Sequence, residues 1–445
     1  MANVIQEVVA HNWCKGCGLC VAVCPQNRLE MRWNSYGCYQ PFELDKDCLA
    51  KCSLCYDVCP AHGNNADESE LGRNEYDLIE GINYSKEMGY WLNTYVGYYG
   101  EQRLKSASGG LATYFLEKLL KQKLVDGIIT VQKTENREKL FSFTICHTVS
   151  ELKQCARSAY YPVEIGTILR EVLPQTNKKY AIMGLPCVCK GVRLAQKRIP
   201  KLKSRFPYVL GLVCGRQCSK YFAEFVCALG GGDPYKLKQI TFRDKDLNQP
   251  ANNLLMRFSW NSDGSVASGK KLWWDGIGSA FTKGFFQPNS CFFCDDVFAE
   301  CADAVFMDAW LSKYIRDPKG HTIMITRNPK VDALLDNNDE ITINEIESEK
   351  VIQSQQAVVA KKRIRQVRKD EPKLRSDLVI RPSLVEHKIN CLRRELAYCS
   401  TSIWNYSKDP ELLNKQCREP VMKLSFFLKI IRVQNFIKRV LKQIS

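Results

Sequence analysis

Apolar positions in the middle of the chain switch between helical and strand-like spacing. Apolar residues recur with the period of a helix over 111–120, and the short apolar run 125–131 that follows is typical of a buried strand. A second helix is predicted over 219–229, where the three glycines at 230–232 end it. Further strands are predicted at 180–183, 208–213, 239–242 and 321–326. This alternation predicts an α/β domain.

The two ends of the chain depart from this alternation. The first part is dense in cysteine, and the polar stretch 62–73 that follows it is typical of a linker. The last hundred or so residues carry charged helical patterns with few strand signals. The fold class is therefore α+β and multidomain, with three predicted parts: 1–68, 69–345 and 346–445.

Cysteines in the first part follow the spacing of bacterial ferredoxins. The first motif is C-x2-C-x2-C-x3-C-P, made by Cys14, Cys17, Cys20, Cys24 and Pro25. The second motif is made by Cys48, Cys52, Cys55, Cys59 and Pro60. Its first gap holds three residues instead of two, so ligation by Cys48 is the weakest assignment, and Cys38 is the nearest substitute. We therefore expect a bacterial-ferredoxin-like module with two 4Fe-4S clusters.

The fourth cysteine of each motif is expected to serve the other cluster. One cluster then takes Cys14, Cys17, Cys20 and Cys59. The other takes Cys48, Cys52, Cys55 and Cys24. Structural zinc is the alternative, but zinc sites usually need two ligand pairs across a longer loop, not two four-cysteine runs that each end in proline.

Cysteine content and charge favour an intracellular metal-binding protein over a secreted disulfide-bonded protein or a nucleic-acid-binding protein. The chain holds 22 cysteines without a visible export signal, which favours metal ligation in a reducing cytoplasm over disulfides. Its formal charge is +16, with basic runs at 361–369 and in the acid-free segment 423–445. Nucleic-acid binding is not expected, because no recognised motif or aromatic–basic platform accompanies the charge.

The final segment has the pattern of an amphipathic helix. Its apolar positions are Phe426, Phe427, Ile430, Ile431, Ile437, Val440, Leu441 and Ile444. Its opposite positions are Lys429, Arg432, Arg439 and Lys442. Such a helix either lies on an anionic membrane surface or docks its apolar face on the protein's own core. Both interpretations remain open, and the first gives a peripheral location on the inner face of the membrane.

Several short segments between about residues 95 and 327 carry a family resemblance. They are Ser-Ala-Ser-Gly-Gly at 106–110, Gly-Leu-Pro-Cys ending at Cys187, Gly-Leu-Val-Cys ending at Cys214, Cys-Phe-Phe-Cys from Cys291 to Cys294, and Asp-Ala-Trp from Asp308 to Trp310. Together they resemble the family of beta subunits of coenzyme F-420 (deazaflavin) hydrogenases and dehydrogenases. The chain departs from the family at Leu311, where relatives tend to carry glycine.

The resemblance implies a central flavin and iron–sulfur domain that holds FAD beside a third 4Fe-4S cluster. The implied cluster ligands are Cys187, Cys214, Cys291 and Cys294. Two cysteines at strand ends and a Cys-x2-Cys turn can converge although they lie far apart in the sequence. Cys189 and Cys218 are close enough in sequence to be confused with the ligands. The remaining cysteines are expected to pack as small apolar residues: Cys146, Cys155, Cys227, Cys301, Cys391, Cys399 and Cys417.

The flavin pyrophosphate is assigned to the start of the helix at 111. Hydroxyls and backbone amides stand there, where the helix dipole favours an anion. The predicted contacts are Arg103, Lys105, Ser106, Ser108, Gly109 and Gly110. Without the family context, this segment would more simply be a helix N-cap and a tight turn. No catalytic acid or base can be named, since none of the five histidines stands in a recognised pairing.

The functional hypothesis is an iron–sulfur flavoprotein oxidoreductase. Electrons pass between the ferredoxin-type clusters, the third cluster and FAD, to or from a deazaflavin-like or other small organic substrate. The alternative is a non-catalytic electron-transfer subunit that delivers electrons to a partner enzyme. The redox partner is thus either a protein or a small molecule, and the sequence does not choose between them.

Overall fold

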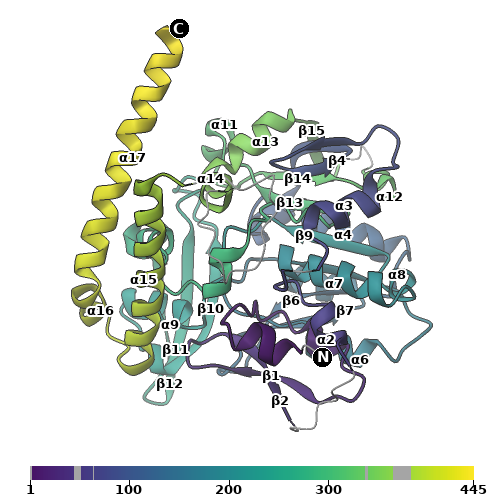
Figure 1. Cartoon of the computed structure of the whole chain (residues 1–445), viewed down its shortest axis with the longest axis horizontal. Helices are drawn as coiled ribbons and strands as arrows, with labels where there is room; N and C mark the ends of the chain where they lie inside the picture. Colours follow the sequence, from purple (N-terminus) through teal and green to yellow (C-terminus); the bar gives the residue numbers. More distant parts are fainter. Residues whose placement is uncertain (1–2, 45–51, 64, 336–338, 364–381, 445) are drawn as a thin grey trace.

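The computed structural model describes residues 3–44, 52–63, 65–335, 339–363 and 382–444, without the side chains of 101, 363 and 438–444. An eight-stranded sheet forms its centre, in the order β15-β5-β14-β13-β9-β8-β6-β7 (Figure 1). Its strands are β5 (Asn93–Tyr99), β6 (Gly127–Lys133), β7 (Phe141–Cys146), β8 (Tyr180–Gly184), β9 (Tyr208–Leu212), β13 (Ala304–Asp308), β14 (Thr322–Thr326) and β15 (Ile341–Glu345).

The predicted α/β alternation is confirmed only for the centre of this sheet. Strands β6, β8, β9 and β13 are parallel neighbours. The flanking strands, β7 on one side and β14, β5 and β15 on the other, each pair antiparallel with the strand next to them. The sheet is therefore mixed, and the chain has an α+β architecture. Antiparallel edge strands added to a parallel core are common in large sheets.

Helices cover both faces of the sheet. Neighbouring strand residues point to opposite faces, so Ile128 packs with one core and Ile129 with the other. The helix predicted from the 111–120 pattern is α4 (Leu111–Lys121), which covers the first face. On the second face lies α7 (Pro186–Arg198), whose Val188 and Val192 are buried against the sheet. Shorter helices follow the strands: α5 (Val149–Gln154), α6 (Gly166–Val172), α8 (Leu202–Arg205), α11 (Ser312–Ile315) and α12 (Pro329–Asp332).

A second sheet of three antiparallel strands stands beside the first. It contains β10 (Leu237–Asp244), β11 (Leu255–Ser262) and β12 (Ser265–Leu272), which pack with α9 (Tyr221–Leu229) and α10 (Gly278–Lys283). The C-terminal region is helical among the described residues, as predicted. Its helices are α13 (Ser348–Ser354), α14 (Gln356–Arg363), α15 (Leu384–Tyr406), α16 (Pro410–Gln416) and α17 (Arg418–Ile444).

Helix α17 packs along α15 and then projects beyond the body of the molecule (Figure 1). Leu424 is fully buried on the side that meets α15, and Phe427 and Ile431 pack against the same core. The internal-docking interpretation is therefore correct for this face of the helix. Among the described helices, none is long and apolar enough to cross a bilayer.

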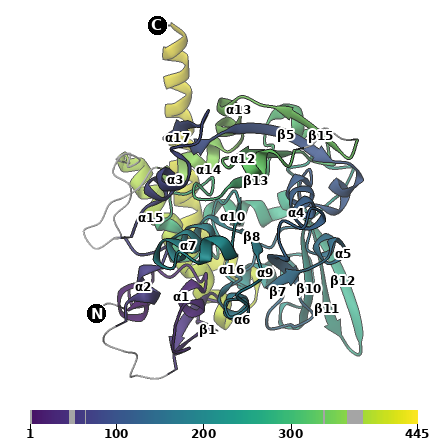
Figure 2. The same cartoon turned by 90° about the vertical axis from the view of Figure 1, so that its right-hand side faces the viewer.

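The N-terminal segment lies against α6 and α7 (Figure 2). It contains η1 (Ile5–Val9), α1 (Leu19–Ala22), β1 (Leu29–Trp33), β2 (Tyr39–Glu43), α2 (Leu54–Asp57) and α3 (Glu68–Tyr76), followed by the hairpin β3 (Asn83–Ser85) and β4 (Gly89–Trp91). Its Leu19 joins the same apolar core as Ile182 of the sheet and Val351 of α13. One core thus includes residues from all three predicted parts, and the division at 68 and 345 stays a prediction.

The linker prediction for 62–73 is wrong in its second half. Asp67 caps the start of α3 by accepting a hydrogen bond from the Glu70 amide, and Leu71 and Tyr76 are buried. The Tyr76 hydroxyl donates to the Cys301 carbonyl at 2.9 Å. A polar stretch can form a docked helix when one side carries a few apolar residues, and that is the case here.

Candidate functional site

Four cysteines of the two ferredoxin motifs face one another at the start of the chain. The pKa of Cys14 is raised to about 12, chiefly by burial, and the nearby Cys17 thiol contributes to the rise. Burial likewise raises the pKa of Cys17 to about 12, with the Cys59 thiol as the next cause. Cys20 has a pKa well above its ordinary value because it is buried beside Cys17, Cys14 and Cys59. These are the four cysteines expected to share one cluster.

Glycines shape the first motif. Gly16 and Gly18 have φ values of 68° and 84°, which a side chain at Cβ would disfavour. The Gly16 amide donates to the Cys14 sulfur at 3.4 Å. The chain therefore turns sharply between successive cysteines, so that their thiols can point to one side.

The second cysteine set is described in part. Cys48 lies outside the described residues, so its ligation stays a prediction. Cys24 accepts a hydrogen bond from the Arg28 amide at 3.4 Å, and Cys55 is buried beside Cys20 and Cys59 in a small apolar core. Cys52 stands just before α2. The two candidate cluster sites are thus neighbours within the N-terminal segment.

The four dispersed cysteines of the central region also come together. Cys187 lies in the first turn of α7, Cys214 follows β9, and Cys291 and Cys294 belong to the turn η5 (Asn289–Phe293) and its end. Gln217 links two of them, because its amide donates to the Cys291 sulfur at 3.3 Å and its side chain to the Cys187 sulfur at 3.5 Å. This convergence joins sequence positions more than a hundred residues apart.

Electrostatic coupling supports the same grouping. Burial raises the pKa of Cys214 to about 12, while the Lys362 ammonium lowers it and the thiols of Cys291 and Cys294 raise it. Cys187 has a pKa well above its ordinary value, chiefly from burial, and Cys17 is the next cause. The central cysteines therefore border the first ferredoxin motif.

Two lysines face the central cysteines. Burial lowers the pKa of Lys15, but the thiols of Cys294, Cys187 and Cys291 more than offset it, and the pKa is raised. Lys362 of α14 donates to the Cys294 sulfur at 3.5 Å. Lys15 stands inside the first motif, and Lys362 belongs to a basic run that sequence reasoning noted only as charge. The contact of each lysine with the central cysteines could not be read from spacing.

The donor sets fit iron–sulfur clusters. A cubane cluster needs four thiolates at separate corners of a cube, and each fully described set supplies four converging thiols. Among the described residues, no group of three or more His, Cys, Asp or Glu meets at a point suited to a single metal ion. If clusters bind here, these cysteines would hold them, the two lysines would balance part of their charge, and the clusters would serve as one-electron carriers.

Most cysteines outside the predicted ligand sets are buried or partly buried within the protein. Cys189 is fully buried and donates to the carbonyls of Gly184 and Leu210 at 3.7 and 3.6 Å. Cys218 is buried beside Arg216, 3.7 Å from its guanidinium. Cys146, Cys227, Cys301 and Cys417 are buried, and Cys155, Cys391 and Cys399 are partly buried.

Cys38 has neighbours other than those proposed from the sequence. Burial raises its pKa, and the next causes are the thiols of Cys291, Cys14 and Cys218. Its sulfur therefore lies between the first motif and the central cysteines.

The predicted flavin segment lies where expected, at the start of α4, but most of its polar groups are engaged within the protein. Ser108 donates to the His321 carbonyl at 2.6 Å, and Ser106 donates to the Gln102 carbonyl at 3.0 Å. Buried Arg103 pairs with Asp317. These contacts hold the loop in place and leave Lys105 as the exposed charge.

The two glycines of this segment have structural roles. A Cβ on Gly109 would lie 2.5 Å from the Gly97 carbonyl oxygen and 2.5 Å from the Thr322 amide, so three backbones meet there. Gly110 caps α4 with a φ of 89°. The two glycines thus form the helix N-cap and tight turn that the sequence alone would suggest. Contact of either glycine with a flavin stays a prediction.

A basic cavity of about 170 Å³ opens beside Lys105. It lies between the end of β6 and the residues that follow α5, and sequence reasoning did not find its other cations, Lys133, Lys153 and Arg157. Burial and the neighbouring Arg157 lower the pKa of Lys133. Single basic residues at the end of a strand, in a short helix or in a loop carry no sequence signal of this kind, because only the fold brings them together.

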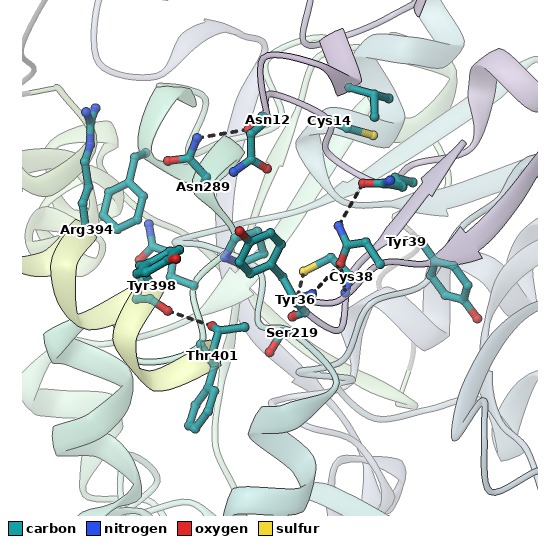
Figure 3. A pocket seen from close by; sticks show the side chains of 18 residues that line it. Asn12, Cys14, Tyr36, Cys38, Tyr39, Ser219, Asn289, Arg394, Tyr398 and Thr401 are labelled. Carbon is teal, nitrogen blue, oxygen red and sulfur yellow. Dashed lines mark hydrogen bonds between the residues drawn. The ribbon is translucent and has the colours of Figure 1, made fainter. Parts of the chain in front are cut away.

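A second cavity, of about 100 Å³, lies between the N-terminal segment and α15 (Figure 3). Cys14 and Cys38 line one side, and Arg394 and Tyr398 of α15 line the other (Figure 3). Buried Ser219, whose hydroxyl has no hydrogen-bond partner among the described residues, also lines it. This cavity therefore adjoins the Cys14 site.

A mixed sheet that gathers cysteines at the ends of its central strands, beside a ferredoxin-spaced segment, is typical of a redox protein. The chain belongs to the family of coenzyme F420 hydrogenase/dehydrogenase beta subunits. The N-terminal model of that family matches residues 94–170, and its C-terminal model matches residues 177–350. The family resemblance seen in the sequence is therefore confirmed.

Similar proteins are found in Methanocaldococcus jannaschii and Methanosarcina mazei. The chain is 23% identical over 363 residues to a coenzyme F420-dependent sulfite reductase of Methanocaldococcus jannaschii, covering 77% of this chain and 49% of that protein. It is 22% identical over 224 residues to one of the subunits of the F(420)H(2) dehydrogenase of Methanosarcina mazei, covering 48% of this chain and 56% of that protein. The chain thus spans about half the length of the curated relatives it matches.

Among solved structures, the chain is similar to one from the F420-reducing [NiFe] hydrogenase complex of Methanosarcina barkeri. The TM-score is 0.47 at 14% identity, covering 63% of this chain and 92% of that one.

Proposed function

We propose that this protein is an iron–sulfur flavoprotein oxidoreductase. Electrons pass between two ferredoxin-type 4Fe-4S clusters, a third 4Fe-4S cluster and FAD, to or from a deazaflavin-like or other small organic substrate. Family membership supports an oxidoreductase, and the relatives named above are an F420-dependent reductase and a subunit of an F420H2 dehydrogenase. The particular cofactors and substrate are proposals for this chain.

The observation that carries the proposal is the closeness of the first motif to the central cysteines. Cys17 is among the groups that shift the pKa of Cys187, and Lys15 is shifted by three of the central thiols. Two cluster sites whose ligand cysteines lie side by side would form a short route for one-electron transfer. The protein's own contribution is to hold the thiols, keep water out and balance the charge of the clusters.

The flavin is proposed to lie near the start of α4, with its phosphates toward the basic cavity. Lys105 belongs both to the predicted flavin contacts and to the cavity lining. Lys133, Lys153 and Arg157 also line the cavity, where Lys153 is ion-paired with Glu117 and Arg157 with Asp244. When bound, FAD exchanges electrons in pairs or singly, which suits a role between an organic substrate and clusters. In this proposal, the cations orient the phosphates and the Ser106–Gly110 loop closes one side.

The deciding experiment is anaerobic purification followed by iron, sulfide and flavin analysis. Three 4Fe-4S clusters correspond to about twelve iron atoms per chain, and FAD should be released on denaturation. About eight iron atoms would remove the third cluster from the proposal, and a protein without flavin would remove FAD.

A non-catalytic electron-transfer subunit is the second candidate. The chain spans about half the length of the relatives it matches, one of which is itself named as a subunit. A purified protein that is reduced by dithionite, yet reduces no deazaflavin or other acceptor until a partner enzyme is added, would favour this role.

The proposal also includes contact of α17 with an anionic membrane surface. The helix carries a second apolar stripe, opposite to the face that docks on α15. Met422, Phe426, Val433, Phe436 and Ile437 form this stripe, and each is at least half exposed. From Lys423 onward the helix has no acidic residue, so its charge is complementary to anionic lipid.

A further inference from the structure

Lys362 brings a positive charge to the central cysteines from a part of the chain outside the family match. It lies in α14, beyond residue 350, where the C-terminal family model ends. The residue is only 4% exposed, and its ammonium group is 3.5 Å from the Cys294 sulfur and 2.5 Å from the Asp296 carbonyl oxygen. A buried lysine needs such partners because its charge has lost the solvation of water.

The ammonium group of Lys362 contacts both a ligand sulfur and a backbone carbonyl. Burial lowers the pKa of Lys362, but the thiols of Cys294 and Cys214 raise it, followed by the buried Asp296 carboxyl group and Cys291. The positive charge of Lys362 therefore stands beside the ligand cysteines Cys294, Cys214 and Cys291, with the Asp296 carboxyl group nearby.

We propose that Lys362 sets the reduction potential of the cluster held by the central cysteines. This inference rests on the proposed function, because it requires the third cluster. Reduction adds one electron and makes the site more negative by one charge, so a fixed ammonium group close to a ligand sulfur stabilises the reduced state. A hydrogen bond to a ligand sulfur acts in the same direction.

The neighbouring lysine offers a matched control. Lys361 is adjacent in sequence and in the same helix, but its amine donates to the Gln287 side chain at 3.3 Å. Lys361→Met therefore removes a lysine from the same helix without removing a hydrogen bond to a ligand sulfur.

The test is an anaerobic redox titration of the full chain, followed by electron paramagnetic resonance. Lys362→Met should shift the midpoint potential of the third cluster to a more negative value and leave the N-terminal clusters unchanged. Lys362→Arg should keep the midpoint potential close to that of wild type, because arginine retains both the positive charge and the hydrogen-bond donor. Lys361→Met should shift the potential less than Lys362→Met does.

Each other outcome also decides the question. An unshifted potential in Lys362→Met overturns the inference, as does an equal shift in Lys361→Met. Loss of the third cluster in Lys362→Met but not in Lys362→Arg supports a charge-dependent role for Lys362. Equal loss in both variants would mean that Lys362 acts only through packing, and it would overturn the inference. A wild-type protein without a third-cluster signal would instead refute the proposed function.

Discussion

Gly18 and Gly166 bring the backbone of the N-terminal segment into direct contact with that of α6. A Cβ on Gly166 would lie 2.2 Å from the Gly18 carbonyl oxygen, and a Cβ on Gly18 would lie 2.6 Å from the Gly166 amide nitrogen. The Ile165 amide donates to the Cys17 carbonyl at 2.9 Å beside this contact. The first cysteine motif is therefore held against the central region by main-chain contact.

Replacing Gly166 with alanine should loosen this contact. The added methyl group meets backbone atoms that cannot rotate away, so we expect a loss of at least about 2 kcal/mol in the free energy of unfolding. Urea unfolding of the cluster-loaded protein measures it. Gly215→Ala is the control, because a Cβ there meets only the Val358 methyl groups at 3.5 and 3.6 Å. Equal stability of the Gly166 and Gly215 variants would contradict the expected clash.

Serine in place of Cys291 or Cys294 should remove one cluster. Iron should fall by about four atoms per chain while the ferredoxin-type signal remains, because the two cysteine sets lie in different segments. Cys189→Ala serves as the control, since that sulfur donates to two backbone carbonyls and belongs to neither set. Full iron content in both serine variants would show that the ligand assignment is wrong.

The flavin site is better tested at Lys105 than at Gly109. Gly109→Asp is the obvious choice from the sequence, but its side chain would collide with the backbones of Gly97 and Thr322 before it met a ligand. Lys105→Glu reverses an exposed charge at the basic cavity and should lower FAD occupancy several-fold. Lys86→Glu, on an exposed loop elsewhere, should leave occupancy unchanged. Equal flavin content in the two variants would move the phosphate site elsewhere.

Lys245 should make stability depend on pH. Burial and the nearby Arg243 lower its pKa to about 7, whereas the unfolded chain has a lysine pKa of about 10.4. Between these values the unfolded chain binds more protons, so the contribution of Lys245 to stability is lowest below pH 7 and rises toward pH 10. Unfolding at about pH 6 and about pH 9 should show wild type gaining stability relative to Lys245→Met. A pH-independent difference would exclude this titration.

The exposed stripe of α17 should bind anionic vesicles. Glutamate at Val433 and Ile437 should abolish sedimentation with anionic vesicles while the protein stays folded, because the docking face around Leu424 is untouched. Binding by wild type should weaken with salt and be absent for zwitterionic vesicles. Truncation before Lys423 is a poorer test, since it removes Leu424 from the core. A protein that binds no vesicle but forms dimers through this stripe would contradict the membrane proposal.

The sequence predicted those elements whose signal is local. The helix at 111–120 and the strands at 180–183 and 208–213 have clear apolar patterns, and α4, β8 and β9 confirm them. The exposed strand β12 was missed because its side chains alternate too little in polarity to mark a strand. The linker at 62–73 was misjudged because docking of Tyr76 depends on Cys301, which lies far along the chain.

The candidate site divides in the same way. Cysteine spacing predicted one group that lies close together, and family resemblance predicted another; cluster ligation by either group stays a prediction. The first group is Cys14, Cys17, Cys20 and Cys59, and the second is Cys187, Cys214, Cys291 and Cys294. Lys15, Gln217 and Lys362 were not predicted, because contacts with sulfur across such sequence distances depend on tertiary structure.

The closeness of Cys17 and Cys187 also has a consequence for how the two sites form. The predicted N-terminal ligands lie between residues 14 and 59, whereas the central site takes cysteines from positions 187 to 294 and needs the sheet to bring them together. In the proposed function, the central cluster therefore requires the folded sheet, whereas the N-terminal clusters take their ligands from one short stretch of chain. The main-chain contact between Gly18 and Gly166 joins these two regions.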